Sequence, residues 1–161
     1  MRKISHIIIH CSDFPYGDVK QIDGWHRDNG WNGIGYHRVI LNGHIASDEV
    51  IEIYDGLVEH GRDLALNGSH ARGHNRNSIG ICLIGVDEFT KAQLFSLLFL
   101  LREFIEKFDI KIDNILGHNE IKQSGGKTCP NFSVEKIRAF LRDKDFDPAK
   151  LPPRDKDFNF V

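Results

Sequence analysis

The stretch ISHIIIHC at residues 4–11 decides the fold, because it is apolar on both of its faces. Such a strand is typical of the middle of a sheet that helices cover on both sides. The period of two puts His6, Ile8 and His10 on one face of this strand. We therefore expect His10 at the end of a central, buried strand.

Two more segments predict strands of the same kind. SIGICLIG at residues 78–85 is a second continuous apolar run that ends in glycine, which indicates another buried strand. NILGH at residues 114–118 indicates a short strand that ends in His118. His10 and His118 are thus both expected where a strand gives way to a loop.

Two hairpins are predicted between these strands. GYHRVIL at residues 35–41 alternates well enough for a strand, and the Asn42-Gly43 pair after it predicts a tight turn. Residues 50–64 predict another hairpin, which closes at Asp55-Gly56. Both dipeptides are therefore expected to reverse the direction of the chain.

The clearest helix is predicted over residues 91–107. Thr90 and Gln93 form a capping box at its start, and apolar side chains recur along it at helical spacing. Shorter helices are predicted after Asp18 and after Ser133, which both stand in capping positions. Because strands alternate with helices, the pattern predicts an α/β fold.

Length and charge favour one domain with no broad attraction for polyanions. A chain of 161 residues can bury a core large enough to fold as one unit. Its formal net charge of -2 provides no field that would attract nucleic acid or an anionic membrane. We expect no nucleic-acid partner, and a monomer, because nothing in the sequence demands assembly.

The N-terminal segment and the cysteines indicate a protein that is made in the cytoplasm. The apolar run at residues 4–11 is short and broken by histidines, so we expect neither a signal peptide nor a membrane-inserted span. The three cysteines, Cys11, Cys82 and Cys129, lie far apart and cannot all pair. Structural disulfides are therefore not expected.

His10, His118 and Cys129 are the candidate metal ligands. All three are expected at strand or loop ends, and two imidazoles with one thiolate are ligands that zinc prefers. Three protein ligands with water in the fourth position are typical of a catalytic zinc site. Their wide separation along the chain leaves open the alternative that they are buried structural residues.

The segment GGKTCPNF at residues 125–132 adds a positive charge to this set. In an extended segment residues two apart share a face, so Lys127 and Cys129 are expected to point the same way. Pro130 disfavours a helical conformation at Cys129, which supports the extended interpretation. The charge of Lys127 is expected to favour the ionised form of the Cys129 sulfur.

Six motifs, in their order and spacing, resemble a known family. They are HCSD (10–13), GWHRDNGWNGIGYH (24–37), GRD (61–63), GSHARGHNRNSIGICLIG (68–85), GHNE (117–120) and KTCPNF (127–132). The sequence resembles the zinc-dependent N-acetylmuramoyl-L-alanine amidases of the type-two family, which includes phage amidase lysozymes and animal peptidoglycan recognition proteins. The similarity is greatest to the short phage lysozymes and spans roughly residues 4–141.

This resemblance implies a single domain with a central mixed β-sheet flanked by helices, similar to the peptidoglycan recognition proteins. It also implies one zinc ion per chain and hydrolysis of the amide between N-acetylmuramic acid and L-alanine in peptidoglycan. His10, His118 and Cys129 match the zinc ligands of the family. Tyr36 and Lys127 match its two catalytic side chains. Lys127 would stabilise the oxyanion, and Tyr36 would orient the water or pass a proton to the leaving nitrogen.

Four more side chains are predicted to support the site. His70, Arg72 and Asn75 lie in a stretch that resembles a wall of the substrate groove, although a polar surface loop would have the same composition. Glu120 is expected to orient a zinc ligand, or else to be an exposed acid at the start of a helix.

One position departs from a related branch of the family. Cell-wall recycling amidases carry a catalytic glutamate where this sequence places Cys82, which points toward the branch that uses a tyrosine. We expect a phage endolysin or a bacterial lytic enzyme that acts on the cell wall after release or delivery. Two alternatives stay open: a module that binds peptidoglycan without cleaving it, with or without a second protein partner, and a cysteine hydrolase that uses Cys11 or Cys129.

The amidase domain is expected to span residues 1–142. Residues 143–161 are charged and contain proline, and the sequence RDKDF occurs at 142–146 and again at 154–158. This segment is predicted to be a C-terminal tail, either loosely ordered or able to bind a partner.

Overall fold

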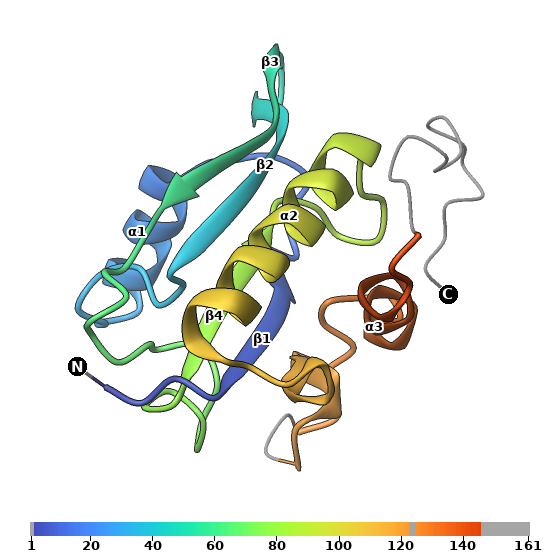
Figure 1. Cartoon of the computed structure of the whole chain (residues 1–161). Helices are drawn as coiled ribbons and strands as arrows, with labels where there is room; N and C mark the ends of the chain where they lie inside the picture. Colours follow the sequence, from blue (N-terminus) through green and yellow to red (C-terminus); the bar gives the residue numbers. More distant parts are fainter. Residues whose placement is uncertain (1, 123–124, 146–161) are drawn as a thin grey trace.

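The computed structural model describes residues 2–122 and 125–145. Within them, five strands form one sheet and helices cover both of its faces (Figure 1). The elements follow one another in the order β1 His6–Cys11, α1 Val19–Asp28, β2 Arg38–Ala46, β3 Glu49–His60, β4 Ser78–Leu83, α2 Lys91–Phe108, η1 Ile112–Asn114, β5 Ile115–Gly117, η2 His118–Glu120 and α3 Val134–Arg142.

The sheet is mixed, with the strand order β3-β2-β4-β1-β5. Strand β1 lies between β4 and β5 and runs parallel to both. Strand β2 is parallel to β4 and antiparallel to β3. The three isoleucines of β1 are completely buried, as expected for a strand that is covered on both faces. The predicted single α/β domain with a central mixed sheet is confirmed.

Alternate residues of the central strands separate two layers of core. Ile7 and Ile9 pack with α2 and α3 in the larger core, whereas Ile8 faces the loops on the opposite side. Helix α1 contributes Ile22 to the core on that opposite side. Figure 1 shows α2 crossing one face of the sheet. His10 has the parity of Ile8 and therefore points away from α2.

The caps predicted for the two longer helices are present. Thr90 and Gln93 form a complete capping box at the start of α2. The Asp18 carboxylate accepts a hydrogen bond of 2.7 Å from the Gln21 N–H at the start of α1. Helix α3 begins directly after Ser133, although no side-chain hydrogen bond from Ser133 caps it. None of the helices in the described part of the chain is both long and apolar enough to cross a membrane.

The two predicted turns are wrong, because β2 and β3 run through both of them. The connection between β2 and β3 is at residues 47–48, and Asn42 pairs with Asp55 inside the ladder. The register shifts on both sides of Asn42. Gly43 and Gly56 have φ angles of 81° and 82°, so each supplies a left-handed residue to a bulge and not to a turn.

The predicted C-terminal tail falls mostly outside the described residues. Helix α3 ends at Arg142, where the domain boundary was predicted, and only residues 143–145 follow it in the description. The boundary between domain and tail therefore stays a prediction.

Gln93 connects helix α2 to the sheet. Its side chain is completely buried, and its Nε2 donates to the carbonyl oxygens of Ile40 at 3.0 Å and Ile84 at 2.8 Å. Its Oε1 accepts from the Thr90 N–H at 2.9 Å. One amide thus satisfies backbone groups from β2, from the residue after β4 and from the start of α2.

We expect Gln93→Leu to lower the free energy of unfolding by about 1–3 kcal/mol, because it leaves buried backbone groups without partners. Urea denaturation measures this change. The matched control is Glu106→Gln on the exposed face of the same helix, for which a change within about 0.5 kcal/mol is expected. Equal stabilities of the two variants would contradict the role given to Gln93.

Candidate metal centre and active site

The structure brings His10, His118 and Cys129 together. One potential ligand atom from each lies within 4.8 Å of the other two. His10 belongs to the end of β1, and His118 directly follows β5. The parallel pairing of Ile9 with Gly117 explains why two histidines more than a hundred residues apart become neighbours. Their ring centroids are 4.5 Å apart.

Backbone contacts hold Cys129 beside the two strands. The Cys11 N–H donates to the Cys129 Sγ at 3.3 Å, and the same sulfur lies 3.8 Å from His10 Nδ1. The Cys129 carbonyl oxygen accepts from the Asn119 N–H at 2.8 Å. The loop that carries Cys129 is therefore fixed to the ends of both β1 and β5.

Both histidines are uncharged at neutral pH. Burial, aided by nearby positive charge, lowers the pKa of His10 well below its ordinary value. Burial also lowers the pKa of His118, and the charge of Lys127 contributes in both cases. A neutral imidazole has a free lone pair, which is the form that binds a metal. Lys127 itself is exposed, and its effect on both histidines indicates that its charge lies close to this site.

The expectation for the Cys129 sulfur is wrong. The hydrogen bond with the Cys11 thiol and then burial raise the pKa of Cys129, and Lys127 does not offset them. The thiol is therefore protonated before a metal binds. A coordinated thiol loses its proton, so a metal bound by Cys129 would displace this proton.

The donor set fits a metal ion. Two neutral imidazoles and one cysteine sulfur are typical ligands of borderline-soft divalent ions such as zinc. In residues 2–122 and 125–145 this is the only group of three or more His, Cys, Asp or Glu side chains close enough to share an ion. The centre can thus hold a metal with three protein ligands.

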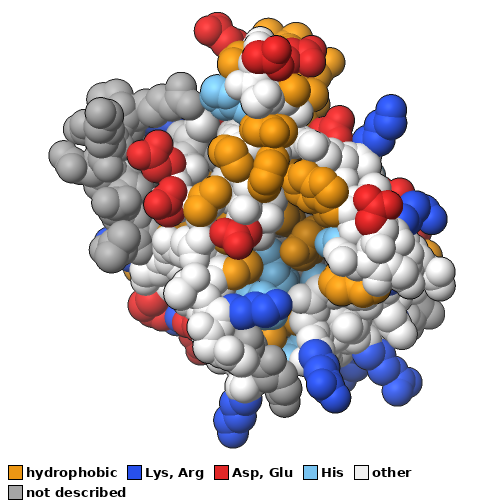
Figure 2. All heavy atoms as spheres, turned by 180° about the vertical axis from the view of Figure 1, so that it is seen from behind, with side chains coloured by type: hydrophobic (Ala, Val, Ile, Leu, Met, Phe, Trp, Pro, Cys, Tyr) orange, Lys and Arg blue, Asp and Glu red, His pale blue; other side chains and the backbone are white. Residues whose placement is uncertain are grey.

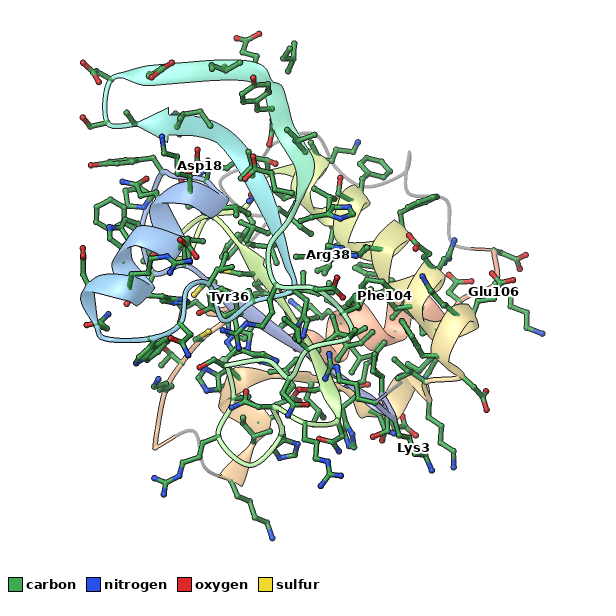
Figure 3. All side chains as sticks on the ribbon, turned by 90° about the vertical axis from the view of Figure 1, so that its left-hand side faces the viewer. Lys3, Asp18, Tyr36, Arg38, Phe104 and Glu106 are labelled. Atoms are coloured by element: carbon green, nitrogen blue, oxygen red, sulfur yellow. The ribbon has the colours of Figure 1, made fainter. Side chains whose placement is uncertain are left out.

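Tyr36 lies beside the centre. Its ring centroid is 5.0 Å from that of His10, and its side chain packs with the core on the α1 side of the sheet. Figure 3 shows Tyr36 on that side, with Arg38 toward α2. Burial, and then nearby thiols, raise the pKa of Tyr36 well above its ordinary value. Its hydroxyl therefore keeps its proton at neutral pH.

The three predicted groove residues, His70, Arg72 and Asn75, lie on the loop between β3 and β4, and their side chains point in different directions. His70 points inward, with its Nδ1 3.0 Å from His10 Nε2. The Asn75 Oδ1 accepts from the backbone N–H groups of His70 at 2.9 Å and Ala71 at 2.8 Å, so it stabilises the loop. Arg72 is exposed. Of the three, Arg72 has the most accessible side chain.

Figure 2 shows histidine side chains at the bottom of a hollow in the surface, with hydrophobic side chains along one border and basic side chains along another. The His10 ring contacts the rings of Tyr36, His70 and His118 and is itself completely buried.

Comparison with known proteins agrees with this geometry. The family described as N-acetylmuramoyl-L-alanine amidase matches residues 1–132. The chain belongs to the N-acetylmuramoyl-L-alanine amidase family.

Relatives of this amidase include phage enzymes and insect recognition proteins. The endolysin of Escherichia phage T7 is 36% identical over 141 residues, which cover 81% of this chain and 82% of that protein. The N-acetylmuramoyl-L-alanine amidase LysC from Clostridium intestinale URNW has a TM-score of 0.73 at 30% identity, with 89% of this chain and 88% of that chain covered. A Drosophila PGRP-LB mutant in complex with tracheal cytotoxin has a TM-score of 0.61 at 25% identity, with 81% and 76% covered.

The family resemblance matched Cys82 to the catalytic glutamate of the cell-wall recycling amidases. Cys82 pairs with His10 across β1 and β4 and is completely buried. Burial raises the pKa of Cys82 well above its ordinary value. A buried, protonated thiol is unsuited to proton exchange with a substrate at neutral pH, and that Cys82 does not replace the glutamate stays a prediction.

Glu120 holds the strand end that precedes His118. Its carboxylate accepts from the Gly117 N–H at 2.7 Å and forms a bidentate pair with Arg138, at 2.7 and 3.0 Å. Arg138 also donates to the Ile115 carbonyl oxygen at 2.7 Å. Glu120 therefore acts on the backbone of β5, and its link to His118 runs through Gly117.

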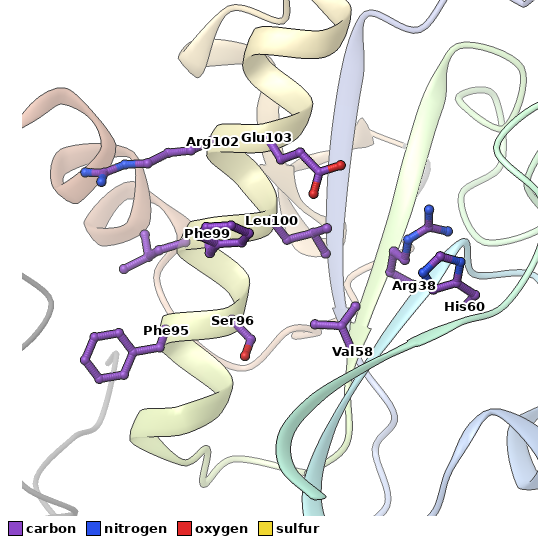
Figure 4. A pocket seen from close by; sticks show the side chains of 10 residues that line it. Arg38, Val58, His60, Phe95, Ser96, Phe99, Leu100, Arg102 and Glu103 are labelled. Atoms are coloured by element: carbon purple, nitrogen blue, oxygen red, sulfur yellow. The ribbon is translucent and has the colours of Figure 1, made fainter.

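A separate pocket of about 520 Å³ lies on the other side of the sheet (Figure 4). Side chains of α2 and of β2 and β3 line it, among them Phe99, Val58 and Arg38. It includes neither the metal centre of the amidase nor Tyr36.

Glu120 should make stability depend on pH. Burial alone would raise the pKa of Glu120, but hydrogen bonds from Arg138 and from the Gly117 N–H leave it lowered. A lowered carboxylate pKa stabilises the fold above the unfolded-state value of about 4.3, and this contribution is lost as the pH falls through the folded-state pKa. We expect Glu120→Gln to reduce stability in urea more at about pH 7 than at about pH 3. An equal deficit at both values would show that the charge is unimportant.

Proposed function

We propose that this amidase uses one zinc ion, held by His10, His118 and Cys129, to hydrolyse the amide between N-acetylmuramic acid and L-alanine in peptidoglycan. The observation that carries the proposal is the convergence of three ligand atoms within 4.8 Å of one another at the strand ends of a fold shared with known amidases. Family membership supports the proposed reaction, and the two histidines with one cysteine support zinc as the metal.

Zinc bound there would lower the pKa of water to about 7 and polarise the carbonyl of the scissile amide. The chain itself supplies the remaining functions. The hollow around the histidines positions the amide, and the neutral rings of His10 and His118 keep their lone pairs available.

Lys127 and Tyr36 are the proposed catalytic side chains. As water adds to the amide carbon, negative charge develops on the carbonyl oxygen, and the exposed Lys127 ammonium stabilises that charge. The nitrogen of L-alanine must gain a proton as the C–N bond breaks. The hydroxyl of Tyr36 is protonated at neutral pH and lies beside His10, so it can orient the water or pass this proton.

The proposed partner is the peptidoglycan of a cell wall. A related insect protein has been solved in complex with tracheal cytotoxin, and phage relatives are endolysins. Arg72 has an exposed guanidinium on the loop that carries His70, and we assign it a contact with the substrate. His70 and Asn75 would shape this wall from inside the loop. We propose that the protein acts as a monomer at the wall and needs no nucleic acid.

Purified peptidoglycan tests the function directly. We expect the zinc-loaded protein to release new L-alanine amino termini, the metal-free protein to release none, and added zinc to restore the reaction. Amino termini released after complete zinc removal would refute the zinc mechanism. Tight binding to peptidoglycan with no amino termini from the zinc-loaded protein would show a recognition module instead.

A pair of variants separates metal binding from catalysis. Cys129→Ser should lose zinc and activity together, because it removes one of three ligands. Lys127→Ala should keep zinc and lower kcat by about a hundredfold to a thousandfold, because it removes charge stabilisation only. Zinc content by atomic absorption and kcat by release of amino termini measure both effects. Equal zinc loss in the two variants would contradict the proposal that Lys127 stabilises the oxyanion without binding the metal.

A further inference from the structure

His10 has two ring nitrogens, and they face different partners. Its Nδ1 lies 3.8 Å from the Cys129 sulfur and thus faces the metal centre. Its Nε2 lies 3.0 Å from the Nδ1 of His70, on the side away from Cys129. In a neutral imidazole only one nitrogen carries a proton, so the partner of Nε2 decides whether Nδ1 has a free lone pair.

A chain of hydrogen bonds behind His70 determines where the protons lie. The Ser78 hydroxyl donates its single proton to the His74 carbonyl oxygen at 2.7 Å. Ser78 Oγ can therefore only accept from His70 Nε2, which is 3.3 Å away. With its proton on Nε2, neutral His70 offers Nδ1 as an acceptor. His10 must then donate from Nε2, and its Nδ1 is left unprotonated.

Two glycines leave room for the His70 ring, because a side chain at either position would overlap it. A Cβ atom on Gly80, in the middle of β4, would lie 2.6 Å from Cγ of His70. A Cβ on Gly68 would lie 2.4 Å from its Cδ2. The backbone of His70 is also fixed, since its N–H donates to Asn75 Oδ1 at 2.9 Å. The two glycines and the Asn75 contact thus specify one position for the ring.

We propose that His70 is a positioning residue, which accepts the Nε2 proton of His10 and so keeps the Nδ1 lone pair of His10 directed at the metal centre. This inference deepens the proposed function and rests on it. The role differs from contact with substrate, because His70 acts on a metal ligand from the loop between β3 and β4. Partners of this kind fix the tautomer and orientation of ligating histidines, and their loss typically weakens metal binding by about 10- to 100-fold.

The first test follows the tautomer of His10 in the metal-free protein at neutral pH, by long-range proton–nitrogen NMR of the imidazole. We expect the Nε2–H form in the parent protein. His70→Leu should shift His10 toward a mixture of tautomers, because Nε2 loses its acceptor. His70→Asn keeps an acceptor oxygen on the atom that corresponds to Nδ1, so it should restore the Nε2–H form. An unchanged tautomer in the leucine variant would overturn the proposal.

The second test measures zinc affinity by competition with a chelator. We expect His70→Leu to bind zinc about 10- to 100-fold more weakly and His70→Asn to recover most of this loss. The matched control is His74→Leu on the same loop, which should leave zinc affinity unchanged because that side chain makes no hydrogen bond to His10. Equal weakening by leucine and asparagine at position 70 would overturn the proposal, since packing and not the acceptor would then be responsible.

A third variant, Ser78→Ala, removes the hydrogen-bond partner of His70 Nε2 and leaves His70 itself in place, so it serves if His70→Leu does not fold. Without the serine oxygen His70 is free to change tautomer, so we expect mixed tautomers at His10 and weaker zinc binding. Parental behaviour of Ser78→Ala in both measurements would overturn the proposal. Neither measurement depends on cleavage: loss of wall hydrolysis with the expected tautomers and zinc affinities would refute the proposed function alone.

Discussion

The parallel pairing of β1 with β4 on one side and with β5 on the other is the constraint on which the site depends. It buries Ile7 and Ile9 against α2 and α3, so the alternate residues must face the opposite side. His10 then emerges at the strand end next to the residue that follows β5. Since strand ends are fixed by ladders of hydrogen bonds, the backbone sets the separation of the two histidines.

The same burial prepares the chemistry of the site. It keeps the imidazoles of His10 and His118 uncharged and the hydroxyl of Tyr36 protonated, because a low-dielectric surrounding disfavours each charged form. Cys129 differs from these groups, because the raised pKa of its sulfur favours the protonated thiol, whereas a metal binds the thiolate. Lys127, two residues before Cys129, is exposed. A buried ligand cluster beside an accessible cation is suited to a reaction that develops negative charge.

Sequence patterns predicted the elements whose cause is local. The buried strands at 78–85 and 114–118 and the capped helix after Thr90 follow from hydrophobic runs, helical spacing and capping residues, and the structure contains all three. The prediction of turns at Asn42-Gly43 and Asp55-Gly56 was wrong. Both dipeptides have the composition of turns, but they lie opposite each other inside the β2–β3 ladder and form bulges. A left-handed glycine is needed in both situations, so the sequence could not distinguish them.

For the site, the sequence by itself determined the chemical types: two histidines at strand ends, a cysteine before a proline, and a lysine two residues earlier, in motifs that resemble an amidase family. Only the tertiary structure decided which nitrogen of His10 faces the centre, that His70 lies behind it, and that the Cys129 thiol is protonated. These properties arise from contacts between segments about sixty and more than a hundred residues apart. Proton positions and burial depend on such neighbours in space, which no local pattern specifies.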